Sequence, residues 1–85
     1  MARKRSLLEK MAANPADDWT IADVEQICRE TGLQCLPPSH GSHYVVFSDA
    51  LDGMLTVPAR RPIKPVYIRK LVALATAHAH ARDHR

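Results

Sequence analysis

The spacing of apolar residues changes along the chain and predicts a series of short helices and strands. Ser6 can cap a first helix, about residues 6–13, which ends at Asn14 because a residue before proline avoids the helical region. Thr20 and Asp23 have the capping-box arrangement at the start of a second helix, whose apolar positions recur at helical spacing. The first third of the chain is therefore predicted to be helical.

Between residues 33 and 58 apolar residues recur at every second position, which is typical of strands with one buried face. Three short antiparallel strands are predicted at residues 33–36, 42–47 and 54–57, separated by turn-rich segments. Pro65 then suits the first turn of a final helix, in which the apolar positions again follow helical spacing.

The predicted order α-α-β-β-β-α indicates an α+β fold. A three-stranded antiparallel sheet with helices packed on one face is the arrangement of double-stranded-RNA-binding domains. The 85 residues are enough for one domain, 1–85, with a core over about 20–77 and a frayed tail at 78–85. Fold class alone does not establish function.

The pattern leaves open which side of the sheet faces the helices. If Val46 and Val57 face the helices, then His43, Val45 and Phe47 lie on the open face. The opposite register would bury Val45 and Phe47 and leave His43 at the edge of the core. In the first register, Val45 and Phe47 are candidate contacts for a partner protein, because exposed apolar groups around a functional site often mark an interface.

Composition places the chain among globular proteins, since 46% of its residues are hydrophobic and 25% are charged. No apolar run approaches the roughly 20 residues of a membrane helix, and the basic first residues are not followed by the apolar core of a signal peptide. We therefore expect a cytoplasmic protein without a membrane partner.

The net charge of +3 is distributed unevenly. No acidic residue lies between Asp52 and Asp83, a region that contains six cationic side chains, namely Arg60, Arg61, Lys64, Arg69, Lys70 and Arg82. Such a surface attracts phosphate backbones in a salt-dependent way. An acidic protein partner would be attracted in the same way, so charge alone does not distinguish the two.

Cysteine and histidine spacing predicts no metal or cofactor site. Cys28 and Cys35 lie seven residues apart and match neither a redox motif nor a zinc knuckle, so we expect two reduced thiols. His80 and His84 would share a helical face in the tail, but two histidines without a nearby carboxylate or thiolate make a weak metal site. His78, His80 and His84 are expected at a solvated helix end.

Three motifs occur in order: "GSH" at Gly41-Ser42-His43, "LTVP" at Leu55 to Pro58, and "RPIKPVYIRKL" at Arg61 to Leu71. With the upstream "EKMAANPADDW" and "DVEQICRETGL", they resemble the HicA family of toxins over roughly residues 6–74. The resemblance implies a toxin of a type II toxin–antitoxin module. Such a toxin is an mRNA interferase with a double-stranded-RNA-binding-domain fold, and a HicB-like antitoxin holds it inactive.

The same resemblance assigns the catalytic histidine to His43. Many members carry a second histidine at the next position, which is Tyr44 here, and His40 precedes Gly41 where the family often has Lys, Arg or Gly. Both departures leave the assignment of His43 in place. Whether His40 assists His43 stays open, because a proline-rich turn can bring the two together or hold them apart.

The chemistry agrees with these residue types. Metal-independent RNA cleavage needs a base for the 2′-hydroxyl proton, an acid for the leaving 5′-oxygen, and cations near the phosphorane. An unperturbed histidine titrates near pH 6.5, which suits proton transfer, so His43 is the predicted base. A second group of residues is predicted to contact the phosphate. Gly41 would let the backbone approach it closely, and Ser42 could hydrogen-bond one of its oxygens. Arg60, Arg61 or Lys64 could stabilise the developing negative charge.

Two other functional hypotheses fit the same sequence. A non-catalytic RNA-binding module, or a decayed toxin, would use the same face and the same basic segment without cleaving RNA. A regulatory domain that binds only protein would show no salt-dependent affinity for RNA. The arrangement of Lys and Arg favours the hypotheses in which the protein binds RNA.

Overall fold

The computed structural model describes residues 6–83 and has the predicted α+β architecture. The elements in chain order are α1 (Leu7–Ala13), α2 (Ile21–Thr31), β1 (Gln34–Leu36), β2 (His43–Phe47), β3 (Leu55–Pro58) and α3 (Pro65–Asp83). The strands form one antiparallel sheet in the order β1-β2-β3, which confirms the predicted meander.

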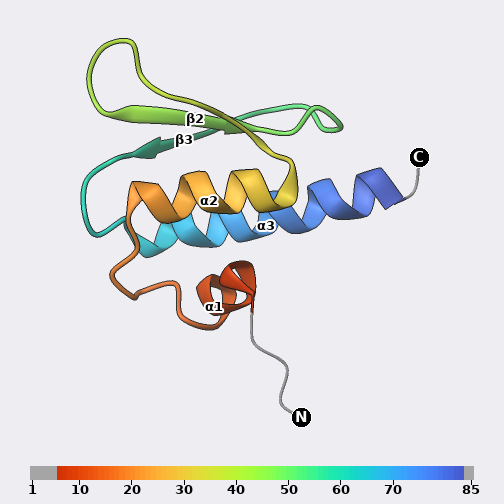
Figure 1. Cartoon of the computed structure of the whole chain (residues 1–85), viewed down its shortest axis with the longest axis horizontal. Coiled ribbons are helices and arrows are strands. Elements are labelled where there is room, and N and C mark those ends of the chain that lie inside the picture. Colours follow the sequence, from red (N-terminus) through yellow and green to blue (C-terminus); the bar gives the residue numbers. More distant parts are fainter. Residues whose placement is uncertain (1–5, 84–85) are drawn as a thin grey trace.

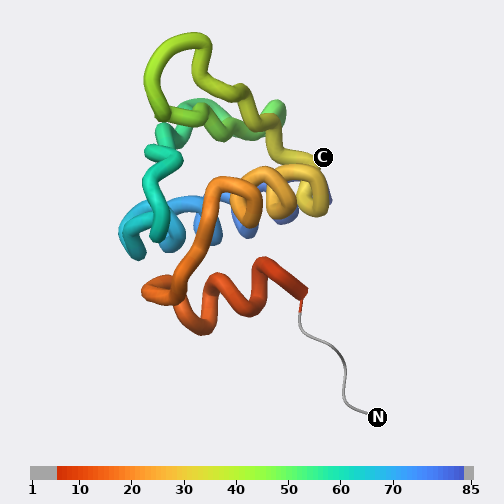
Figure 2. Tube along the Cα trace, turned by 60° about the vertical axis from the view of Figure 1, so that its left-hand side comes forward, coloured from red at the N-terminus to blue at the C-terminus, as the bar shows by residue number. Residues whose placement is uncertain are grey.

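The elements form three layers. The sheet lies on α2 and α3, and α1 lies on the far side of these two helices, away from the sheet (Figure 1). Figure 2 shows the same order from another direction, with α1 against α2 and α3. One face of the sheet is therefore covered by helices, and no helix of the described residues 6–83 covers the other face.

Local signals in the sequence explain where the helices begin and end. The Ser6 side chain accepts a hydrogen bond from the Glu9 N–H at 3.2 Å, which caps α1. Thr20 and Asp23 form the complete capping box at the start of α2, with each side chain bonded to the other residue's backbone N–H. Gly32 ends α2 in the left-handed region at φ 84°. The predicted cap at Ser6 and capping box at Thr20 are confirmed.

The register of the strands decides which face is buried. Val46 and Val57 are both 0% exposed and lie in the core between the sheet and the helices. Residues directly opposite one another in an antiparallel pair share a face, so His43, Val45 and Phe47 lie on the open face. The register that would have buried Val45 and Phe47 under the helices is not adopted.

The prediction of a frayed tail over 78–85 is wrong for its described part, because α3 continues to Asp83. The exposure predicted for His78 is also wrong, since His78 is 0% exposed, whereas His80 is exposed as predicted. His78 Nδ1 lies 2.6 Å from Ser48 Oγ, which also accepts a hydrogen bond from the Ala50 N–H at 3.0 Å. The buried His78 Nε2 has no hydrogen-bond partner in the described part of the chain. His78 thus joins α3 to the end of β2, a contact between residues thirty positions apart.

The cysteines and the remaining histidines show no metal centre. Cys28 is buried, Cys35 is half-buried, and both are free thiols. Burial raises the pKa of the Cys28 thiol to about 12 and raises that of Cys35 above its ordinary value. Residues 6–83 contain no group of three or more His, Cys, Asp or Glu side chains that could hold a metal ion, and His84 lies outside the described residues. No helix within 6–83 is long and apolar enough to span a membrane.

Replacing Gly32 with alanine should destabilise the domain more than replacing Gly53. Both glycines have positive φ, 84° and 91°, so both variants bear the cost of a left-handed backbone, roughly 1–2 kcal/mol. Only at Gly32 would the added Cβ meet a buried atom, His78 Nε2 at 3.3 Å, whereas Gly53 has nothing within 4 Å. The free energy of unfolding, measured by urea denaturation, should therefore fall further for Gly32→Ala. Equal losses in the two variants would contradict the packing of His78 beneath the end of α2.

Candidate nucleic-acid interface

The β2–β3 hairpin places the Gly-Ser-His motif beside the basic segment that follows the sheet. His43 is the register partner of Pro58, and the Ala59 N–H donates a 2.7 Å hydrogen bond to the Ser42 carbonyl, which extends the pairing beyond β3. His43 and Pro58 therefore share the open face. Ser42 adjoins the start of the segment 59–64, which leads to α3.

A pocket of about 170 Å³ lies where this segment passes from β3 to α3. Its lining residues come from the end of β3, from the connecting segment and from the first turn of α3, and they are Pro58, Arg60, Pro62, Lys64 and Tyr67. The first four are alternate residues of a segment that leaves β3 at Pro58 and bends at Arg61 and Pro62 before α3 begins. The residues between them, Arg61 and Ile63, contact the body of the domain instead.

Two anchors hold the connecting segment in place. The Arg61 guanidinium donates to Asp18 through Nε, 3.0 Å from Oδ1, and through Nη2, 2.6 Å from Oδ2. Hydrogen bonding to Arg61 holds the pKa of Asp18 below its ordinary value. The Ile63 side chain is 1% exposed, and its N–H donates to the Trp19 carbonyl at 2.8 Å. The Trp19 side chain is itself in the core.

The pocket carries uncompensated positive charge. Arg60 and Lys64 are exposed and form no ion pair with any residue among 6–83. Arg61 differs because Asp18 neutralises it. The N-terminal end of α3, at Pro65, adds the positive end of a helix dipole to the same region. Of the three predicted cations, two face the pocket and the third anchors the segment that carries them.

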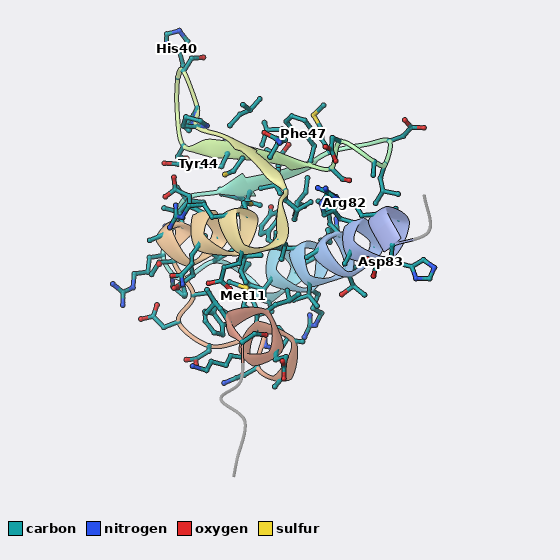
Figure 3. The ribbon with its side chains drawn as sticks, turned by 45° about the vertical axis from the view of Figure 1, so that its right-hand side comes forward. Met11, His40, Tyr44, Phe47, Arg82 and Asp83 are labelled. Carbon is teal, nitrogen blue, oxygen red and sulfur yellow. The ribbon has the colours of Figure 1, made fainter. Side chains whose placement is uncertain are left out.

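The remaining predicted residues, Gly41, Ser42 and His43, do not line the pocket, and its link to them is the pairing of His43 with Pro58 and of Ser42 with Ala59. Gly41 has a positive φ of 79°, and an added Cβ there would meet nothing within 4 Å, so its surroundings are open. Ser42 and His43 are both exposed, and the His43 side chain makes no hydrogen bond or ion pair within 6–83. The imidazole is therefore accessible to a ligand. His40 lies at the tip of the loop before β2 and points away from the domain, so it is not placed to assist His43 here (Figure 3).

Sequence reasoning missed Tyr67 and the two prolines as parts of the site. Tyr67 is half-buried against the core and contributes to the pocket from the first turn of α3. The available signal was the alternation from Pro58 to Lys64, with Tyr67 three residues after Lys64. The alternation by itself does not predict a pocket, because the pocket depends on how the segment bends at Arg61 and Pro62 before α3 begins.

The open face of the sheet is largely apolar. Leu36 is 53% exposed, and its register partner Val45 and the neighbouring Phe47 are half-buried. Met54, just before β3, is 70% exposed. Exposed apolar side chains gathered on a sheet face are typical of a surface that binds another molecule.

Replacing Arg60 with glutamine should weaken the binding of a polyanion such as RNA more than the same change at Arg61. Arg60 faces the pocket without an acidic partner, whereas Asp18 already neutralises Arg61. For a single strand, the slope of log affinity against log salt should become less steep by about 0.7 in Arg60→Gln. Fluorescence anisotropy with a labelled oligoribonucleotide over a salt series measures this slope. An equal change in Arg61→Gln would show that the ion pair does not withdraw Arg61 from the ligand.

The chemistry available at this end of the sheet is that of an accessible imidazole next to a pocket with two cations and an aromatic ring. Such a set of groups can bind a polyanion and transfer a proton. No protein-family model matches the chain, and comparisons with curated proteins and with solved structures likewise found no match.

Proposed function

We propose that this protein is a metal-independent endoribonuclease of the HicA type, the toxin of a type II toxin–antitoxin module that cleaves mRNA. The observation that carries the proposal is the register of His43 opposite Pro58, which sets an exposed imidazole beside the pocket of Arg60 and Lys64. The resemblance of the Gly-Ser-His, LTVP and RPIKPVYIRKL motifs to that family supports the same activity.

In the proposed reaction, His43 accepts the proton of the 2′-hydroxyl, and the 2′-oxygen attacks the adjacent phosphorus. The bond from phosphorus to the 5′-oxygen breaks, leaving a 2′,3′-cyclic phosphate on one fragment and a 5′-hydroxyl on the other. Because the site is exposed, water can supply the proton taken up by the leaving oxygen. His43 then returns its proton to solvent, and no cofactor takes part.

The neighbouring groups support this step. Arg60 and Lys64 stabilise the charge that develops on the phosphate oxygens. Gly41 lets the backbone approach the phosphate closely, and the Ser42 hydroxyl can donate a hydrogen bond to one of its oxygens. Arg61 contributes indirectly by holding the segment in place through Asp18.

We infer that a HicB-like antitoxin neutralises the toxin by covering the open face of the sheet. Leu36, Val45 and Phe47 give this face an apolar surface, and His43 lies on the same face. A protein that buried these side chains would also exclude RNA from His43. Free toxin would degrade translated mRNA and arrest growth in the cytoplasm.

The test is cleavage of a defined mRNA by the purified protein, freed of any co-purifying antitoxin, in the presence of EDTA. We expect fragments that end in a 2′,3′-cyclic phosphate and begin with a 5′-hydroxyl, and no fragments from a His43→Ala protein purified in the same way. Intact RNA with the folded wild-type protein would overturn the proposal and favour a non-catalytic RNA-binding module. Activity that EDTA abolishes would overturn the metal-independent mechanism.

A further inference from the structure

We propose that the pocket formed by Pro58, Arg60, Pro62, Lys64 and Tyr67 is a subsite for one unpaired nucleotide, whose base stacks on Tyr67 while its phosphate lies between Arg60 and Lys64. This inference rests on the proposed function and deepens it. It assigns base recognition to a place beside His43, and it predicts that the protein acts on single-stranded RNA.

The size and walls of the pocket suit a single ring. Its volume of about 170 Å³ is below the roughly 300–1,000 Å³ of sites for drug-sized ligands, so it admits one small group. Pro58 and Pro62 provide rigid apolar walls, and Tyr67 provides an aromatic face. Stacking of a base on an aromatic side chain is the usual way in which proteins bind unpaired nucleotides.

The charge of the pocket suits the phosphate of the same nucleotide. Arg60 and Lys64 are both on the pocket wall, and neither is neutralised by a residue within 6–83. Arg61 and Ile63 anchor the backbone of the segment, so the positions from which the Arg60 and Lys64 side chains extend are set before any ligand binds. A preorganised site loses less conformational entropy on binding.

The position of the pocket connects base recognition to cleavage. Pro58 is both a wall of the pocket and the register partner of His43, so a nucleotide in the pocket would adjoin the phosphate that His43 acts on. A base within a duplex is stacked between its neighbours and cannot enter such a pocket without leaving the helix. The subsite therefore favours unpaired RNA, although the sheet-and-helix layout is shared with domains that bind double-stranded RNA.

The test compares a nucleoside 5′-monophosphate with ribose 5-phosphate, each titrated into the full-length His43→Ala protein and followed by ¹H–¹⁵N NMR. We expect both to shift the amide signals of Lys64 and Tyr67, with the mononucleotide binding about 5- to 150-fold more tightly, as expected for one stacked base. Tyr67→Leu should abolish this preference, and Tyr67→Phe should keep it. Lys64→Gln should weaken both ligands, whereas Lys10→Gln, a matched loss of charge on α1, should not. The spectra themselves show whether each variant is folded.

Several results would overturn the subsite. Equal affinity for the two ligands would show that the base is not recognised, and a preference that survives in Tyr67→Leu would place the base elsewhere. An Asp- and Glu-rich peptide is the competing ligand. If it shifts the amide signals of Lys64 and Tyr67 and the nucleotide does not, the pocket binds an acidic protein partner. Failure of the proposed function can be told apart from failure of the subsite. If the protein binds the nucleotide through Tyr67 but does not cleave mRNA, the ribonuclease proposal is wrong and the subsite stands.

Discussion

Replacing His43 with alanine is expected to lower the rate of RNA cleavage by about 10²–10⁴-fold, the contribution of a positioned general base. The imidazole is exposed on the open face and makes no contact that holds the domain together, so the variant should fold as the wild type does. RNA affinity should also be retained, because Arg60 and Lys64 are unchanged. Single-turnover cleavage and fluorescence anisotropy, carried out with the same oligoribonucleotide, separate the two effects.

His40→Ala is the matched control for this variant. It removes a histidine three residues away on the same loop, and His40 points away from the domain at the loop tip. Its cleavage rate should stay close to that of the wild type. A comparable loss in both variants would show that the loop closes over the substrate and that the two histidines act together. A loss of RNA affinity in His43→Ala as large as its loss of rate would assign His43 to binding rather than proton transfer.

Replacing His78 with alanine is expected to lower the free energy of unfolding by about 2–5 kcal/mol, the scale of large-to-small substitutions in a core. His78 is 0% exposed, and its Nδ1 lies 2.6 Å from Ser48 Oγ, so the change leaves a cavity and removes the contact that joins α3 to the end of β2. Domains of this kind are stable by only about 5–15 kcal/mol, so the loss should be plain in urea denaturation. Thr76→Ala, at an exposed position of the same helix, should have a much smaller effect.

A double-mutant cycle with His78→Leu and Ser48→Ala tests the polar contact separately from the cavity. Ser48→Ala alone should cost about 1–3 kcal/mol, because it leaves a buried imidazole nitrogen without its partner. In the Ser48→Ala background, His78→Leu should be nearly neutral, since it replaces an imidazole with no bonded partner by an apolar side chain of similar size. Additive effects, with no coupling between the two positions, would contradict a stabilising bond between Ser48 and His78.

The helix ends and the order of the elements were predictable because the interactions that set them are local. Ser6 caps α1 through a residue three positions away, and Thr20 and Asp23 do the same for α2. Gly32 ends α2 because its backbone tolerates a positive φ. The two-residue spacing indicated the strands for a similar reason, since alternation along a strand follows from the backbone itself.

The candidate site was predictable only in part. The motifs pointed to Gly41, Ser42, His43 and the cations of the basic segment, and the β2–β3 register brings most of these residues together. Which cations face the ligand was not predictable. Arg60 and Arg61 are adjacent and identical in type, yet Asp18, forty-three positions from Arg61, binds only one of them.

The sequence by itself determined the kind and order of the elements and the residue types available for chemistry, because these depend on neighbours within a few positions. Tertiary structure alone decided that Val46 and Val57 face the helices and that Val45 and Phe47 do not. It also buried His78 near the end of a helix that looks solvated in sequence, and paired Arg61, but not Arg60, with Asp18. The physical reason is that burial and charge pairing depend on residues distant along the chain, whose positions are set only when the sheet closes on α2 and α3.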